Sequence, residues 1–238
     1  MFRYHGSMGG SARHVRDVDG LLRMLDTLFP SPEPFWDHFY EDRDRDVPFF
    51  VAKPDESLVS FVDAGVLRSG RALDLGCGPG RNAAYLASKG FDVEAVDLSA
   101  AAIAWARERA PEVRFRQGDV FTTNLTGPYD LLYDSGCFHH LPPHRRISYL
   151  DLVDRLLAPG GHLAMSCFAA GAERAGTAVP DDQLYRDGAV HGGLAFTSDE
   201  LRAIFTDLTP VEIRRMRAQP PGSPTFGEDF LHVALFRR

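Results

Sequence analysis

The feature that most constrains this chain is a glycine-rich loop between a predicted strand and a predicted helix. In residues 71–87 (RALDLGCGPGRNAAYLA) the apolar run Ala72–Leu75 leads into three glycines, and a helix begins directly after them. The glycines are Gly76, Gly78 and Gly80. Because they lack Cβ atoms, a ligand can lie against this backbone, and amides at the helix N-terminus can hold a polar group. A tight turn without a ligand has the same pattern, so the loop predicts an α/β unit and a candidate binding edge.

Short apolar runs alternate with amphipathic helices from residue 71 onward. The runs predicted as strands are 72–75, 92–96, 113–115, 130–133 and 162–168, and helices are predicted at about 80–89, 100–110 and 144–157. This alternation is typical of a parallel sheet covered by helices on both faces. After a further helix near 198–206, capped by Ser198, two strands (211–218 and 229–238) are joined without a helix and must be antiparallel. The pattern predicts a doubly wound α/β sheet that is mostly parallel and ends in an antiparallel strand.

The region before the sheet is predicted to be helical. Apolar residues at helical spacing indicate a helix in 17–29, PFWDHFYED is expected to form an aromatic helix with Pro34 in its first turn, and a third helix lies near 55–66. We therefore divide the chain into a flexible leader (1–16), N-terminal helices with a lid (17–69) and a ligand-binding domain (70–238). An insertion at about 170–196 in the last of these is a candidate substrate loop.

Composition limits the partners and the compartment. With 44% hydrophobic and 25% charged residues, the 238-residue chain has the balance of one ordinary globular domain. Its net charge of −7 disfavours a nucleic acid as the partner. The sequence contains no run of about 18 apolar residues, so no membrane-spanning helix is predicted. The first residues lack the apolar core of a secretory signal, and the three cysteines (Cys77, Cys137 and Cys167) are widely spaced. We expect a soluble, cytoplasmic protein with a small-molecule partner and no metal; the oligomeric state is left open.

Carboxylates recur where the predicted strands end. Asp74 stands just before the first glycine, Asp97 closes the second run and Asp119 follows the third. A carboxylate at position 74 suits a cationic ligand end and would repel a pyrophosphate, and the spacing G-x-G-x-G differs from the dinucleotide pattern G-x-G-x-x-G. Asp97 could accept two ribose hydroxyls, and Asp119 could bind an adenine amino group. Each Asp alone could equally be a helix cap or a turn residue.

Five segments together resemble the signature segments of class I S-adenosylmethionine-dependent methyltransferases. They are LDLGCGPGRNA, VEAVDLS, QGDV, YDLLYDSGCFHHL and LLAPGGHLAMS. The resemblance implies a Rossmann-like sheet of seven strands, with the last strand inserted antiparallel, and S-adenosylmethionine as cofactor. It also implies contacts of Asp74, Gly76, Gly78, Gly80, Arg81 and Asn82 with the amino-acid end, of Asp97 with the ribose, and of Leu98, Asp119 and Val120 with the adenine. Asp134 and Ser135 would lie beneath the transferred methyl group.

Methyl transfer from a sulfonium needs alignment, exclusion of water and sometimes a base. His139 and His140 are the candidate bases, with His140 favoured, because histidine titrates near neutrality. Either ring could instead pack under the cofactor or hold the loop by hydrogen bonding. Tyr40 is a further candidate for a catalytic role. An aromatic lid helix would help to exclude water, although its side chains could simply pack the helix onto the sheet.

Residues outside the shared core are the candidates for binding the methyl acceptor. They are Trp36, Phe39 and Tyr40 on the aromatic helix, Arg145 at the start of the next helix, and Tyr185 and His191 in the insertion. Arg145 could also be an exposed first-turn residue, and the insertion could be a disordered surface loop. FWDHFYEDRDRDVPFF and the pattern Asp134 to Arg145 weakly resemble thiopurine, halide and tellurite methyltransferases.

Three functions remain open at this point. The leading hypothesis is an enzyme that methylates an O, N, S or C atom of a small molecule. The alternatives are a non-catalytic S-adenosylmethionine-binding regulatory subunit and an aminopropyltransferase-like enzyme. A nucleobase target is disfavoured, because the segment from Asp134 to Cys137 lacks the Asp/Asn-Pro-Pro-aromatic motif of DNA amino-methyltransferases, and Cys137 is expected to be an inert thiol.

Overall fold

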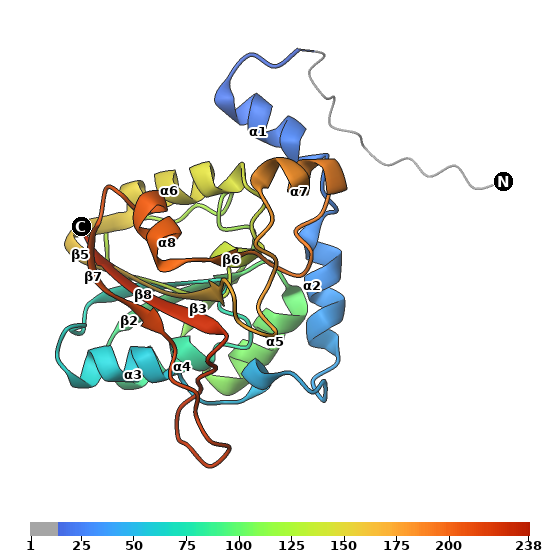
Figure 1. Ribbon diagram of the computed structural model, residues 1–238. Helices are drawn as coiled ribbons and strands as arrows, with labels where there is room; N and C mark the ends of the chain where they lie inside the picture. Colours follow the sequence, from blue (N-terminus) through green and yellow to red (C-terminus); the bar gives the residue numbers. More distant parts are fainter. Residues whose placement is uncertain (1–13) are drawn as a thin grey trace.

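The computed structural model describes residues 14–238 and is built around one mixed sheet (Figure 1). The strands are β1 (Arg71–Leu75), β2 (Asp92–Asp97), β3 (Arg114–Gln117), β4 (Tyr129–Ser135), β5 (Leu157–Ala169), β6 (Ala195–Phe196), β7 (Thr209–Arg215) and β8 (Leu231–Arg237). They lie in the order β3-β2-β1-β4-β5-β8-β7, and the short β6 pairs with β5. Strand β8 is antiparallel to both neighbours, whereas β1 to β5 are parallel. The predicted fold class, with its inserted antiparallel strand, is confirmed.

Helices cover both faces of the sheet, as the alternating pattern predicts. They are α1 (Val18–Asp26), α2 (Pro32–Glu41), α3 (Glu56–Asp63), α4 (Arg81–Ser88), α5 (Ala100–Arg109), α6 (Arg145–Leu156), α7 (Asp181–Asp187) and α8 (Ser198–Ile204), with 3-10 turns η1 (Pro48–Phe50) and η2 (Phe138–His140). One apolar core joins the sheet to α3, α4 and α5. A second core joins the opposite face to α6, α7 and α8 (Figure 1).

The order in which strands are added to the sheet reverses between β1 and β4. From β1 the chain proceeds outward through β2 to β3, then returns to the other side of β1 with β4 and continues to β5. This reversal of strand order makes the carboxyl edge of β1 and β4 the switch point of the sheet, which is where open α/β sheets bind ligands. The glycine loop follows β1, and η2 with its two histidines follows β4.

Several boundaries differ from the sequence prediction. The cap of α8 is Thr197 rather than Ser198, because the Thr197 side chain accepts a hydrogen bond from the Glu200 amide and Glu200 bonds back to the Thr197 amide. Strand β5 starts at Leu157 rather than at residue 162, so it includes the segment expected only to end the helix. The insertion at 170–196 contains α7 and β6, neither of which was predicted. Both are short, and tertiary contacts rather than local pattern stabilise such elements.

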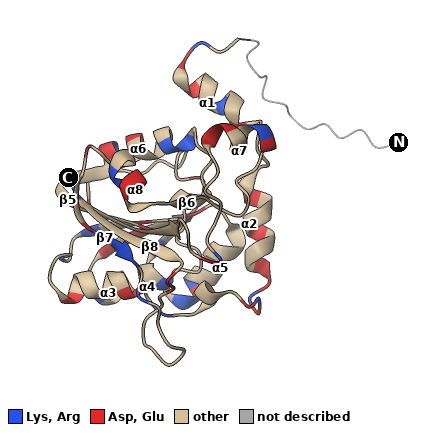
Figure 2. Ribbon diagram, viewed as in Figure 1, with Lys and Arg blue, Asp and Glu red and all other residues tan. Residues whose placement is uncertain are grey.

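The N-terminal part of the chain lies against this core in separate pieces. Residues 1–13 of the predicted leader lie outside the described residues. Helix α2 runs beside α5, and α1 lies near α6 and α7 (Figure 1). Acidic and basic residues both occur on the outer helices, as on α6 and α7 (Figure 2). None of the helices described between residues 14 and 238 has both the length and the apolar character that crossing a membrane requires.

Candidate functional site

The glycine loop after β1 is held in a conformation that favours glycine. Gly76 and Gly78 have φ values of +65° and +50°. A Cβ on Gly76 would lie 2.7 Å from the Cβ of Cys137, so the two loops approach too closely for any side chain there. A Cβ on Gly78 would instead lie 3.0 Å from the hydroxyl of Tyr40 on α2. The loop therefore presents bare backbone to β4 on one side and to α2 on the other.

Asp74, the residue at the tip of β1, has a buried carboxylate without a partner. Its side chain is 1% exposed, and its Oδ2 atom forms no hydrogen bond with any described residue. Burial, only partly offset by the nearby Arg81, raises the pKa of this carboxyl group to about 8. An unsatisfied buried acid is costly unless a ligand supplies the missing donor or charge. The observation fits the cationic ligand end that the sequence predicts at this position.

Asp97, at the tip of β2, is tied to the glycine loop. Its Oδ2 accepts a hydrogen bond from the Gly78 amide at 2.7 Å, and its Oδ1 accepts one from the Ser99 amide at 2.9 Å. Burial raises the pKa of Asp97 to about 6 despite these bonds. Each carboxylate oxygen can accept a second bond, so the contacts leave capacity for ribose hydroxyls. Leu98, predicted to flank the adenine, is half-buried beside it.

The predicted adenine contacts lie in the turn after β3. The Oδ1 of Asp119 accepts a hydrogen bond from the Phe121 amide at 2.8 Å, which is a turn-capping contact. Val120 is buried in the core that packs against α6. The structure thus places both residues at the carboxyl edge of β3, two strands away from Asp74, and their contact with an adenine stays a prediction.

Asp134, at the end of β4, forms bonds within its own loop. Its Oδ1 accepts from the amides of Gly136 and Cys137, and its Oδ2 accepts from the Phe138 amide and the Tyr149 hydroxyl. The side chain is fully buried, and burial raises its pKa to about 6. These bonds assign the Asp134 carboxylate to holding the turn that leads into η2, which places it under the site rather than facing a ligand.

Asp55 is a central residue that the sequence analysis missed. It lies just before α3 and its carboxylate is fully buried. Arg81 forms an ion pair with its Oδ1 at 2.6 Å. Its Oδ2 accepts hydrogen bonds from side chains of two strands and one helix: Tyr133 and Ser135 of β4, Ser166 of β5 and Asn82 of α4. Three of the predicted cofactor contacts, Arg81, Asn82 and Ser135, are therefore engaged with Asp55.

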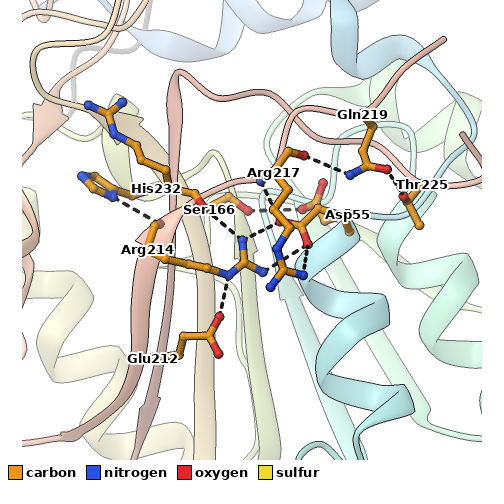
Figure 3. A network of polar contacts seen from close by, with 10 residues as sticks. Asp55, Ser166, Glu212, Arg214, Arg217, Gln219, Thr225 and His232 are labelled. Atoms are coloured by element: carbon orange, nitrogen blue, oxygen red, sulfur yellow. Dashed lines mark hydrogen bonds and ion pairs between the residues drawn. The ribbon is translucent and has the colours of Figure 1, made fainter.

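The only sequence signal at Asp55 was a helix cap after a proline, and no capping bond forms there. Its neighbour Glu56 extends the same network to the C-terminal hairpin, because its carboxylate accepts two bonds from Arg214. Figure 3 shows Asp55 with Ser166 and, nearby, Arg214 bonded to Glu212 and, through its carbonyl, to His232. The N-terminal segment is thus fixed to the sheet end that carries the glycine loop.

His139 and His140 form a contiguous pair in η2. Their Nε2 atoms are 3.0 Å apart, and the His139 ring stacks on Phe168 with 4.0 Å between ring centroids. Burial lowers the pKa of His140 to about 4 and holds that of His139 well below its usual range. The structure brings both candidate bases to the same edge as Asp74, and burial keeps both of them neutral.

The aromatic helix α2 closes over this edge. The Trp36 ring packs edge-on against His140 with centroids 4.8 Å apart, and Tyr40 is buried above Gly78. Asp37 holds the helix in place by accepting a bond from the Ser99 hydroxyl at 2.7 Å. Phe39 packs between Trp36 and Phe50. The helix therefore packs on the fold beside Gly78 and His140, and its role as a lid over a bound cofactor stays a prediction.

The remaining predicted acceptor contacts lie away from the histidine pair. Arg145 is bonded to Asp26 of α1, Tyr185 contacts His144 at 3.1 Å, and His191 is paired with Asp187 at 2.8 Å. The structure does not bring these side chains together with α2. The part of the insertion that reaches the site is its end, where the Leu194 amide donates to the His139 carbonyl at 2.6 Å.

Comparison with known proteins agrees with this geometry. Residues 72–161, which include the glycine loop and the histidine pair, match the methyltransferase domain family. The chain is similar to trans-aconitate 2-methyltransferase of Methylobacterium nodulans, with 40% identity over 97 residues (40% of this chain and 37% of that protein). It is also similar to thiocyanate methyltransferase 1 of Arabidopsis thaliana, with 31% identity over 134 residues (54% and 58%). The chain thus spans about half or less of the length of these curated relatives.

Solved structures show the same fold over most of the chain. The 1,6-didemethyltoxoflavin-N1-methyltransferase of Burkholderia thailandensis, bound to its substrate and S-adenosylhomocysteine, superposes with a TM-score of 0.59 and 24% identity (95% of this chain and 92% of that one). The N-methyltransferase NodS of Bradyrhizobium japonicum, bound to S-adenosylhomocysteine, superposes with a TM-score of 0.60 and 20% identity (85% and 98%). At this level of identity the likeness concerns the fold.

Proposed function

We infer that this chain, a class I S-adenosylmethionine-dependent methyltransferase by its fold and its matched domain, transfers a methyl group from that cofactor to a small-molecule acceptor. The observation that carries the proposal is the Asp74 carboxylate, which is buried without a partner at the tip of β1, beside the glycine loop. Its unmet need for a cation matches the ammonium group of S-adenosylmethionine, and the glycine loop beside it carries no side chain that would block the ligand.

The residues proposed to hold the cofactor follow the order of the strands. Asp74 and the glycine loop would bind the amino-acid end, Asp97 the ribose, and Asp119 with Leu98 and Val120 the adenine. When bound, S-adenosylmethionine supplies a methyl group already activated by its sulfonium charge. Because Arg81, Asn82 and Asp134 are engaged in protein contacts, we assign them to shaping the site rather than to touching the cofactor.

The chain's own contribution to the reaction is alignment and exclusion of water. The new bond is formed by a lone pair of the acceptor atom, the carbon–sulfur bond breaks, and its electron pair stays on sulfur. Helix α2, through Trp36 and Tyr40, covers the edge where this exchange would occur. A dry, preorganised site favours a displacement in which opposite charges are neutralised.

We propose small nucleophiles as acceptors. The relatives named above act on trans-aconitate, a carboxylic acid, and on thiocyanate, both of which present an anionic nucleophile at neutral pH. The low pKa of His140 is consistent with such acceptors, because a base that titrates near 4 gives little assistance at pH 7. No observation among the described residues favours a non-catalytic regulatory role.

The proposal is tested by binding and by product analysis. S-Adenosylhomocysteine should bind in calorimetry with one site per chain, and Asp74→Asn should lower that affinity about 100-fold while the folded state persists. Incubation with S-adenosylmethionine and a panel containing thiocyanate, trans-aconitate, a thiol and a phenol should give a product heavier by one methylene in mass spectrometry. Absence of S-adenosylhomocysteine binding at millimolar concentration would refute the cofactor assignment, and binding without any methylated product would refute the activity.

A further inference from the structure

The hydrogen bonds around His139 fix where its proton lies. The backbone amide of Phe168 points at the Nδ1 of His139 at 3.3 Å. A backbone N–H can only donate, so this Nδ1 must carry a lone pair. The ring is neutral because its burial disfavours a charge, which places its single proton on Nε2. His139 is therefore a donor at Nε2.

The same reasoning fixes the proton of His140. The Nε2 atoms of the two rings are 3.0 Å apart, and the His139 atom supplies the hydrogen. The Nε2 of His140 must then accept, so in the neutral ring the proton lies on Nδ1. No described residue forms a hydrogen bond with this Nδ1, and the His140 residue that carries it is only partly buried. The pair thus ends in an N–H group that has no partner among the described residues.

The surroundings of His140 keep it in this neutral state. The groups packed on its ring are Trp36 from α2, Phe168 from β5 and Gly193 from the insertion. The titratable group that faces it is His139, and burial is the cause that lowers the pKa of His140 to about 4. An additional proton would need to displace the bond from His139, so the ring is poorly suited to accept one.

We propose that His140 is a hydrogen-bond donor to the methyl acceptor, not a general base, and that His139 is the positioning residue that holds its proton on Nδ1. The inference rests on the proposed function and names its substrate class: acceptors that present a lone pair on an anionic group. An N–H group that can only donate favours acceptors in their deprotonated form, such as a carboxylate or a thiolate. A neutral hydroxyl could also accept this bond, but its own hydrogen would then have no partner at His140.

The electron and proton balance is complete without a base. The anionic acceptor loses its negative charge as its lone pair bonds the methyl carbon, and the sulfonium loses its positive charge as the carbon–sulfur pair returns to sulfur. No proton is released or taken up. His140 keeps its proton on Nδ1 throughout, and its role is to orient the anion.

The tautomers can be measured without any turnover. In long-range proton–nitrogen NMR spectra of the ¹⁵N-histidine-labelled protein at pH 7, His139 should appear protonated on Nε2 and His140 on Nδ1, both unchanged down to pH 5. Spectra of His139→Gln and His140→Asn assign the signals, and His38, whose side chain is exposed, provides a reference signal. A spectrum showing His140 protonated on Nε2 would overturn the proposal, whether or not the protein methylates anything.

Matched variants separate a donor from a base. The side-chain amide of His140→Asn can donate from nearly the position of Nδ1, whereas His140→Leu cannot donate at all. With whichever of thiocyanate or trans-aconitate is turned over, we expect His140→Leu to raise KM about 10- to 100-fold and His140→Asn to stay within about fivefold of the parent. The kcat of both variants should be independent of pH between 6 and 9, as for the parent.

Equal loss of kcat in His140→Asn and His140→Leu, together with a parent kcat that falls below neutrality at saturating S-adenosylmethionine, would instead identify a base and refute the donor role. S-Adenosylhomocysteine affinity and thermal unfolding are measured for each variant, so that a folding defect is recognised. If the parent binds S-adenosylhomocysteine but methylates none of the panel, the proposed function fails, while the NMR result still decides the tautomers.

Discussion

The two halves of the candidate site are built in different ways. In the cofactor half, formed by the loops after β1, β2 and β3, the defining contacts join the ends of consecutive strands within one motif, as where Asp97 accepts bonds from Ser99 and from Gly78, 19 positions away. In the acceptor half, formed by α2, η2 and the end of the insertion, they join distant segments, such as Trp36 with His140. The contacts of the cofactor half can therefore be specified by one sequence motif. The acceptor half depends on tertiary packing, so its specificity can change while the motif stays the same.

The residue that connects the halves should show the largest effect. Asp55→Ala removes the partner of the buried Arg81 and the acceptor for Tyr133 and two serines. We expect the free energy of unfolding to fall by about 3 to 5 kcal/mol, because an unpaired charge remains buried. Urea denaturation measures this. Glu108→Gln, which removes an exposed ion pair with Arg43, is the control and should leave the midpoint of unfolding nearly unchanged. Similar losses of stability in the two variants would show that Asp55 does not connect the two halves of the site.

Asp74→Asn should separate the halves most clearly. The substitution keeps the shape of the side chain and removes only its capacity to be charged, so we expect S-adenosylhomocysteine affinity to fall about 100-fold. Because the buried acid has a raised pKa in the folded protein, the variant should be at least as stable as the parent at pH 8. Calorimetry and thermal unfolding give the two quantities. Unaltered affinity would remove Asp74 from the cofactor half.

The pH dependence of the cofactor half has a definite sign. Burial raises the pKa of Asp74 to about 8 and those of Asp97 and Asp134 to about 6, well above the ordinary range of an aspartate. The folded protein thus binds more protons than the unfolded chain, and the stability of the ligand-free protein is lost as pH rises from about 4 to about 8. Binding of a cationic ligand needs the ionised acid, so S-adenosylhomocysteine affinity should rise up to about tenfold per unit between pH 6 and 8.

Titration calorimetry in two buffers of different ionisation enthalpy checks this dependence, because binding at pH 7 should release close to one proton. The Asp74→Asn protein serves as the control and should lose most of the pH dependence of stability between pH 6 and 8. An affinity that stays flat over this interval would contradict the proposed contact between Asp74 and the ligand cation.

Arg145→Ala should have the smallest effect and limits the extent of the acceptor half. The guanidinium is engaged with Asp26, on the side of α6 that faces α1 rather than beside His140. We expect KM and kcat for the acceptor to stay within about twofold of the parent values, as for substitutions outside a site. Steady-state kinetics measure both. A KM raised tenfold or more would extend the acceptor half to α1 and would restore the role that the sequence suggested for Arg145.

The sequence by itself determined the sheet, the inserted antiparallel strand and the position of the cofactor half. The periodicity of two against 3.6 residues, the three glycines and the acids at strand ends are local signals, and local hydrogen bonding realises them. The division of the chain at residues 16 and 69 remains a prediction of the same kind.

Tertiary structure decided which polar side chains are free to meet a ligand. Asp74 and Asp134 look alike in sequence, each ending a strand, yet the first lacks a partner and the second satisfies its own turn. Asp55 resembled a simple cap, and only the folded chain brings it to Arg81, 26 positions away in sequence. The proton on His140 likewise follows from the amide of Phe168, on a neighbouring strand. Such contacts depend on which strands become neighbours, and no local pattern contains that information.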